Sequence, residues 1–134
     1  DAIFGLPEVC RGLLPTCGAL FRALQALPPN IARELVLTGE PMTAVRAHAM
    51  GLVNQLAPKG GSLAKALKMA QRIGQNAPLS VQACLGAMNG LLAATDAAGW
   101  EATRNAYQAI AASHDTQEGI QAFFEKRPPR WLGR

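Results

Sequence analysis

Glu8 is the residue whose type and setting could do acid–base chemistry. It follows Pro7, which fixes its own backbone angle and disfavours helix at the residue before it, and Gly5 and Gly12 flank the turn. Its neighbours in the sequence are apolar: Phe4, Leu6, Val9 and Leu13. A carboxylate in such surroundings should lose hydration, a condition that suits general acid–base catalysis. The alternative is a glutamate at an exposed turn between a strand and a helix, which is the commoner situation.

A second group of chemically capable residues lies at the carboxy end. Four cations there supply much of the formal net charge of +4: Lys126, Arg127, Arg130 and Arg134. Such a cluster indicates a local anion site and not a stripe along which nucleic acid binds. An RNA-binding tail is the weaker interpretation, because Trp131 is a single aromatic residue among these cations and offers no stacking platform. We therefore expect no nucleic-acid partner.

Metal and nucleophile chemistry has little support in the sequence. His48 and His114 have no partner at triad or metal-ligand spacing, so each is expected to be structural. Cys10, Cys17 and Cys84 are odd in number and lack CxxC spacing, which supports neither a zinc site nor a disulfide framework. We expect them to be small buried residues in a reducing cytoplasm. No apolar run approaches the roughly 20 residues of a membrane span, and no signal peptide is evident, so no membrane partner is expected.

The elements that position these residues should be mostly helical. The 134 residues suffice for one domain, and because only 5% are aromatic the core must be built from Leu, Ala, Ile, Val and Met. That composition favours helices over a β-sandwich. Charged residues make up 16% and hydrophobic residues 49%, a low charge density for an independent soluble monomer. We therefore expect an apolar face that meets another chain or segment.

Periodicity and breakers divide the chain into two short strands and a series of helices. A short strand leading into a turn is expected over 3–9 and a second strand over 52–56. They should belong to a sheet whose other strands lie elsewhere, because two lone strands are unstable in water. Helices are expected over 17–26, 29–38 and 43–51, from Ser62 through Ile73, from Pro78 through Leu92, from Trp100 through Ile110, and from Asp115 through Phe124.

Capping residues support several of these helices. Gly39 is a glycine stop, and Thr43 and Ser62 are good N-caps. Asp115 with Glu118 has the spacing of a capping box and should begin the last helix.

Six motifs occur in order along the chain. They are Phe-Gly-Leu-Pro-Glu-Val at 4–9, Gly-Leu-Leu-Pro at 12–15, Glu-Leu-Val-Leu-Thr-Gly-Glu at 34–40, the stretch 47–54 ending Gly-Leu-Val-Asn, Asn-Ala-Pro-Leu-Ser-Val at 76–81, and Glu-Gly-Ile to Phe-Glu-Lys-Arg at 118–127. Together they resemble the carboxy-terminal half of a crotonase-superfamily protein and are most similar to the enoyl-CoA hydratases. The resemblance covers nearly the whole chain.

The resemblance implies a mainly α chain with two short strands, forming the carboxy-terminal part of the α/β crotonase fold. Residues 1–60 would be the incomplete end of the ββα-spiral core, and residues 61–134 the helical association region. Family members build trimers through these terminal helices, commonly paired into hexamers. The resemblance therefore implies a homo-oligomer.

The resemblance also implies a role for the Pro-Glu turn. Glu8 would be the second of two glutamates that hold the water added across a conjugated double bond, and Pro7 would lie beside it at the substrate. Thr16 would offer its backbone N–H to that water, although the chain reads Thr-Cys-Gly-Ala from this position where many hydratases are glycine-rich. Its bulk leaves the shape of the substrate pocket open.

Three further residues are implied at the nucleotide end of coenzyme A. Lys126 matches a family lysine that meets the phosphates, and Tyr107 and Phe123 match positions that line the adenine, often from a neighbouring subunit. The alternative is that the two aromatic residues are core residues on helical stripes and that Lys126 is a solvated charge.

The function implied is syn hydration of a 2-enoyl-CoA thioester, with no cofactor because coenzyme A is part of the substrate. The first glutamate and the two N–H groups of the oxyanion hole lie, in the family, in segments before this one, so we expect a missing amino-terminal half and an inactive isolated chain. Isomerases, decarboxylases and thioester hydrolases share the scaffold, so enoyl-CoA isomerisation is an alternative. A non-catalytic helical oligomerisation module is another.

Overall fold

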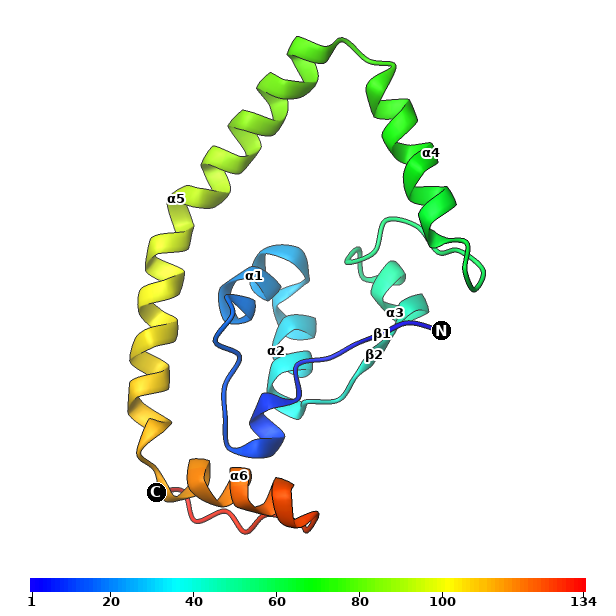
Figure 1. Ribbon diagram of the computed structural model, residues 1–134. Helices are drawn as coiled ribbons and strands as arrows, with labels where there is room; N and C mark the ends of the chain where they lie inside the picture. Colours follow the sequence, from blue (N-terminus) through cyan, green and yellow to red (C-terminus); the bar gives the residue numbers. More distant parts are fainter.

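Helices dominate the computed structural model, which describes residues 1–134 (Figure 1). The elements in chain order are β1 (Ile3–Phe4), the 3-10 helix η1 (Pro7–Arg11), α1 (Ala19–Ala26), α2 (Pro29–Thr38), β2 (Met42–Thr43), α3 (Ala44–Ala49), α4 (Ser62–Gly74), α5 (Pro78–Ala111) and α6 (His114–Glu125). The predicted fold class, mainly α with two short strands, is confirmed.

The two longest helices extend beyond the smaller elements. In Figure 1 the strands and the helices α1 to α3 lie beside the lower half of α5 and below α4, while α6 crosses below η1. The chain turns by 111° between α4 and α5, so these two helices diverge from their connection. Helix η1, which carries Glu8, packs against both α2 and α6.

Several local signals act as the sequence predicts. Pro29 is the first residue of α2, where its missing N–H costs nothing, and Gly39 ends that helix with a left-handed φ of 67°. Thr43 caps α3 by accepting a hydrogen bond from the Arg46 amide at 3.2 Å. The cap of α4 is Gly61, so Ser62 is its first helical residue and the predicted cap is wrong by one position.

Strand β1 pairs with β2, a strand that the sequence did not predict, so the first predicted strand does have a partner within the chain. β1 and β2 are antiparallel, with Ile3 opposite Thr43 and Phe4 opposite Met42. The short strand leading into a turn that is predicted over 3–9 is present: Ile3–Phe4 forms the strand, and the turn continues as η1 from Pro7. Strand β2 has only two residues, and the second, Thr43, is also the N-cap of α3, so it carries too little pattern to be predicted from sequence.

The segment 52–56 is not a strand, so that prediction is wrong. Its backbone turns back onto α3: the amides of Leu52 and Val53 both donate to the carbonyl of Ala47, at 2.9 and 3.3 Å. The Val53 carbonyl in turn lies 2.7 Å from Nδ1 of His48. These bonds occupy the groups that a sheet ladder would use, which also gives His48 a structural role.

The region from Pro78 to Ala111 is one continuous helix of 34 residues, where the sequence predicted two. The connecting stretch 93–98 is rich in alanine and contains no proline, so nothing in it breaks a helix. Gly99, inside the helix, lies against the ring of Phe21, and a Cβ at this position would collide with that ring. The glycine therefore allows close packing and does not mark a helix end.

The second half of α5 packs against α1. Phe21 meets Trp100 edge to face with the ring centroids 5.3 Å apart, and Arg22 pairs with Asp96 at 2.7 Å. Gln25 also donates to the hydroxyl of Thr95 at 2.9 Å. These contacts fix the lower part of α5, which leads into α6.

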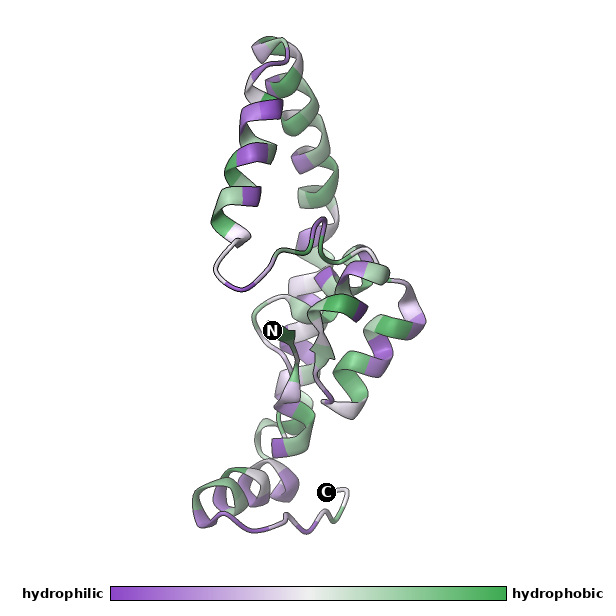
Figure 2. Cartoon of the chain, turned by 90° about the vertical axis from the view of Figure 1, so that its right-hand side faces the viewer, coloured by the Kyte–Doolittle hydropathy of each residue, from purple (hydrophilic) through white to green (hydrophobic).

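The core is small, and much apolar surface faces outward. Five residues form the central cluster: Leu27, Ala32, Leu35, Met42 and Ala47. Large apolar side chains are exposed along α4 and the first half of α5, namely Leu63, Leu67, Ile73, Leu79, Leu85, Met88, Leu91 and Leu92. Figure 2 shows the corresponding green positions where these helices extend away from the rest. The expected exposed apolar face is therefore present. The predicted boundary at residue 60, between the end of the spiral core and the helical association region, stays a prediction.

No single helix combines the length and apolar composition needed to cross a bilayer; α4 and α5 meet that test only when counted together across their 111° bend. The three cysteines are free and exposed, so the prediction that they are buried is wrong.

Candidate functional site

Glu8 lies in the first turn of η1, a short 3-10 helix that begins at Pro7. The helix ends at Gly12, which adopts a left-handed φ of 66° and turns its N–H back toward the carbonyls of Glu8 and Val9. The Leu13 amide also donates to the Glu8 carbonyl, at 3.0 Å. The backbone of Glu8 is therefore held by the turn that follows it.

The carboxylate of Glu8 is free of any partner within the chain. Its Oε2 atom is the one buried side-chain oxygen or nitrogen that makes no hydrogen bond. Buried polar atoms are almost always paired, so a buried carboxylate oxygen without a protein partner is available to bind water or to react. This atom therefore marks the strongest candidate for a reactive group.

The end of α2 supports η1 from one side. The thiol of Cys10 lies 3.5 Å from the Thr38 carbonyl, and Gly39 lies so close to Cys10 that a Cβ on the glycine would press against the sulfur. The glycine stop of α2 thus has a second use, because it also gives η1 room to approach.

Helix α6 supports η1 from the other side, through backbone packed on backbone. A Cβ on Gly119 would collide with the carbonyl group of Arg11, and a Cβ on Gly12 would collide with the carbonyl of Asp115. The hydroxyl of Thr116 donates to the Gly12 carbonyl at 2.7 Å, and the Arg11 guanidinium lies 4.5 Å from the ring centroid of Phe123. We call these contacts the α6–η1 seam.

The start of α6 differs from the predicted capping box. Ser113 is the N-cap, and its hydroxyl accepts a hydrogen bond from the Thr116 amide at 3.1 Å. Asp115 and Glu118 lie inside the helix and bind the carboxy-terminal tail instead. Asp115 and Glu118 have the spacing of a capping box, but Ser113, two residues before Asp115, caps the helix.

The tail folds back along α6 and is held by these two carboxylates. Asp115 accepts hydrogen bonds from the amides of Leu132 and Gly133 at 2.7 and 2.8 Å, which together hold its pKa below the usual value. Glu118 binds the Arg127 guanidinium through both oxygens, at 2.6 and 2.9 Å, and accepts the Arg130 amide at 2.8 Å. The Arg127 pair first, and then this amide, lower the pKa of Glu118 to about 2.

The Glu118 pair should make folding stability fall in acid. Because its pKa is about 2 when folded and 4.5 in its ordinary state, its contribution is present above about pH 4.5 and lost as the pH falls toward 2. We expect Glu118→Gln to lower the unfolding midpoint at neutral pH and to flatten its decline over this interval, measured by thermal unfolding across pH. Glu101→Gln, at an exposed unpaired position of α5, is the control; an unaltered acid slope in Glu118→Gln would contradict the assignment.

The other predicted site residues are exposed, and of these only Pro7, the first residue of η1, is next to Glu8 in the chain. Thr16 lies in a turn three residues before α1, and its amide takes part in none of the chain's backbone hydrogen bonds. Tyr107 on α5 and Phe123 on α6 are about half exposed, and Lys126 ends α6 with a left-handed φ of 54°. Phe123 alone is linked to the Glu8 turn, through Arg11.

Sequence reasoning missed Arg11, Thr116 and Gly119. A glycine inside a helix, directly after Glu118, is a signal of close backbone approach that could have been used. Nothing in the sequence indicates that its partner lies at residues 11 and 12.

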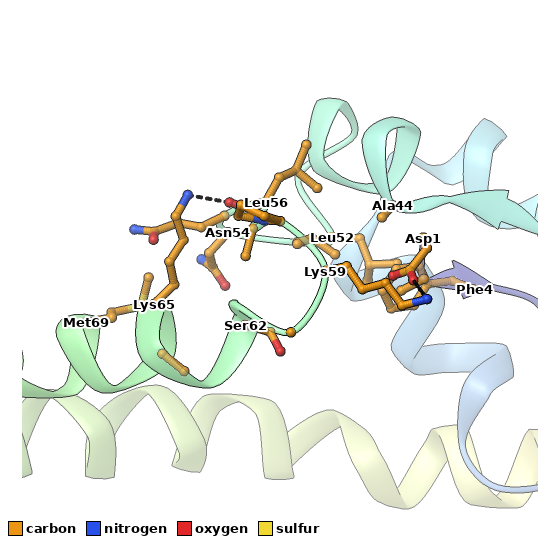
Figure 3. Close-up of a pocket in the computed structure, with 17 residues that line it drawn as sticks. Asp1, Phe4, Ala44, Leu52, Asn54, Leu56, Lys59, Ser62, Lys65 and Met69 are labelled. Carbon is orange, nitrogen blue, oxygen red and sulfur yellow. Dashed lines mark hydrogen bonds and ion pairs between the residues drawn. The ribbon is translucent and has the colours of Figure 1, made fainter.

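A cavity of about 520 Å³ opens elsewhere in the fold, and Glu8 is not among the residues that line it (Figure 3). It opens between the first residues of the chain and the segment from Leu52 to Met69, where Lys65 donates to the Leu56 carbonyl. None of the predicted site residues lines it.

Comparison with known proteins gives consistent matches. A sequence model described as enoyl-CoA hydratase/isomerase matches residues 1–134. A probable mitochondrial enoyl-CoA hydratase of Dictyostelium discoideum is 38% identical over 97% of this chain and 47% of its own length, and the 2,3-dehydroadipyl-CoA hydratase of Escherichia coli is 35% identical over 100% and 52%. The structure of a carnitinyl-CoA dehydratase from Mycobacterium avium aligns with a TM-score of 0.91 and 43% identity, over 99% of this chain and 53% of that one. The chain thus spans about half the length of the curated relatives it matches.

Proposed function

Since the chain belongs to the enoyl-CoA hydratase/isomerase family and forms the carboxy-terminal part of the crotonase fold, we propose that it carries one catalytic glutamate of an enoyl-CoA hydratase. The substrate would be a 2-enoyl-CoA thioester. The observation that carries the proposal is the buried, unpartnered Oε2 of Glu8, which is available to bind the reacting water.

The reaction adds one water molecule. One carboxylate takes a proton from water as the water oxygen bonds to C3, and a carboxylic acid gives a proton to C2 with syn geometry. The negative charge that develops on the thioester oxygen is stabilised by two N–H donors. Glu8 is one of the two carboxyl groups; its turn is rigid, so it can hold the water without reorganising.

We propose further that the first glutamate and the oxyanion hole come from the half that precedes this segment in its relatives. We call the segment together with that half the full-length protein. The missing half would also cover part of the apolar surface that the fold leaves exposed.

The 134-residue chain alone is therefore expected to hydrate crotonyl-CoA no faster than the background reaction. On this proposal it has one carboxylate of the pair and lacks both oxyanion donors, and the loss of even one such donor costs about 10²–10³ in rate. Loss of the absorbance of the conjugated thioester measures turnover, with the full-length protein as the positive control. Turnover by the short chain at a rate near that of the control would contradict the proposal.

Hydration is favoured over double-bond isomerisation by the relatives. Those in Escherichia coli and Mycobacterium avium are named a hydratase and a dehydratase, which are the same chemistry in opposite directions. Isomerisation on the same scaffold is the alternative, because it also needs a carboxylate that moves a proton at C2.

Binding of the rest of the substrate is proposed for five residues. Pro7 and Thr16 would border the acyl end, while Tyr107, Phe123 and Lys126 would meet the nucleotide of coenzyme A. Arg11 already covers one face of Phe123, so adenine would have to use the other face or the edge of that ring.

Assembly into trimers or hexamers is also proposed, supported by the exposed apolar residues of α4 and α5. Association without catalysis is the second candidate function, and the same surface favours it.

A cytoplasmic location stays a prediction, since relatives in Dictyostelium and Arabidopsis are named as mitochondrial. That no cofactor is needed also stays a prediction.

A further inference from the structure

We propose that Thr116 on α6 is a positioning residue that fixes the direction of the Glu8 carboxylate by holding the turn at Gly12. This inference rests on the proposed function, because it assigns Thr116 a part in presenting Glu8 to the substrate. Thr116 lies 104 residues from Gly12 in the chain, and its hydroxyl is the one side-chain group that hydrogen-bonds the backbone of the Glu8 turn from another element of the fold.

Thr116 is buried, and its hydroxyl contacts three elements of the fold; we call this set of contacts the Thr116 clamp. Thr116 is only 7% exposed. Its hydroxyl oxygen lies 2.7 Å from the Gly12 carbonyl oxygen and 3.0 Å from the Ile110 carbonyl oxygen. The Ser113 hydroxyl donates a hydrogen bond to the Thr116 hydroxyl oxygen at 3.2 Å. The Thr116 hydroxyl therefore joins the end of α5, the cap of α6 and the end of η1 at one point.

The peptide groups of Gly12 connect this clamp to Glu8. The N–H of Gly12 closes the 3-10 turn onto the carbonyls of Glu8 and Val9, while its own carbonyl is held by Thr116. A shift of Gly12 would therefore move the Glu8 backbone through hydrogen bonds that span one turn.

Glu8 depends on this backbone support because nothing else directs its side chain. None of the chain's hydrogen bonds or ion pairs involves its carboxylate, and Oε2 is buried without a partner. The position of the carboxylate must then come from the packing of η1 alone. Misplacement of a reacting group by about 1 Å costs on the order of 10²-fold in rate.

The test compares two buried threonines in the full-length protein. Thr116→Val removes the hydroxyl that binds Gly12, and Thr116→Ser keeps it. Thr103→Val is the matched control, because Thr103 is 3% exposed and its hydroxyl bonds only the Gly99 carbonyl of its own helix, at 2.8 Å. The readouts are kcat and KM for crotonyl-CoA and amide hydrogen exchange of residues 8–13.

Thr116→Val is expected to lower kcat about 10- to 100-fold with KM within about twofold, and to speed exchange in residues 8–13. Thr116→Ser should restore both readouts, and Thr103→Val should leave both as in the wild type. If Thr116→Val does not fold, Thr116→Cys takes its place, since a thiol of similar size is only a weak donor.

Wild-type kcat and unchanged exchange in Thr116→Val would overturn the inference, and so would an equal loss in Thr103→Val. If the wild-type protein does not hydrate enoyl-CoA at all, the proposed function is wrong, and exchange alone then decides the role of Thr116. Faster exchange in residues 8–13 supports the clamp, and unchanged exchange refutes it.

Discussion

Replacing Glu8 with glutamine in the full-length protein is expected to lower kcat for crotonyl-CoA hydration by about 10²–10⁴-fold, the usual contribution of one general acid or base. Glutamine has nearly the shape of glutamate, so the η1 turn and the α6–η1 seam should survive. Its amide can neither take a proton from the attacking water as a general base nor give one to C2 of the substrate as a general acid. Glu8→Gln should therefore lower turnover and leave assembly intact. Analytical sedimentation measures the assembly state beside the rate.

Glu40→Gln is the matched control for this substitution. Glu40 is an exposed glutamate just after the stop of α2, and its carboxylate takes part in none of the chain's ion pairs. Its removal should leave kcat within about twofold of the wild type, as is usual for surface positions. Unchanged turnover in Glu8→Gln would remove Glu8 from the mechanism, whereas loss of turnover together with loss of assembly would assign it a structural role.

Gly119→Ala is expected to destabilise the protein by about 3 kcal/mol, at the upper end of the cost of overpacking. The added methyl group would collide with the carbonyl group of Arg11 and lie 2.9 Å from the Gly12 amide nitrogen. These are backbone atoms, which cannot rotate away as a flexible side chain could. Relief requires α6 to move off η1, and that would break the Thr116 bond to Gly12 as well. Denaturant unfolding of the full-length protein measures the change.

The same substitution at Gly74 is not expected to destabilise the protein. Gly74 is the last residue of α4, and a Cβ there meets no atom within 4 Å. Gly74→Ala should leave stability unchanged or raise it by up to about 1 kcal/mol, because alanine loses less backbone entropy in a helix. Equal unfolding midpoints for the two variants would show that the seam is not closely packed.

Some elements could be predicted because their signals lie within a few consecutive residues. Pro29 begins α2, Gly39 ends it and Thr43 caps α3, and each acts through its own backbone or a partner at most three residues away. The amphipathic helix α4 follows from the same kind of local pattern.

Predictions failed where a distant contact decided between two local possibilities. Residues 52–56 have the composition of a strand but are bonded to α3, and Asp115 and Glu118 have the spacing of a cap but hold residues 127–133. In α5 an internal glycine was free to end the helix and instead makes room for Phe21. Local sequence supplied both possibilities in each case, and packing selected one.

The sequence by itself determined the family through six ordered motifs and singled out Glu8 as the candidate acid–base residue. Only the tertiary structure decided how Glu8 is held. The carboxylate has no side-chain partner, so its position depends on Gly12, Thr116 and Gly119, two of which are more than 100 residues away. A contact across that separation depends on how α5 returns the chain to its beginning. No pattern within either segment encodes it.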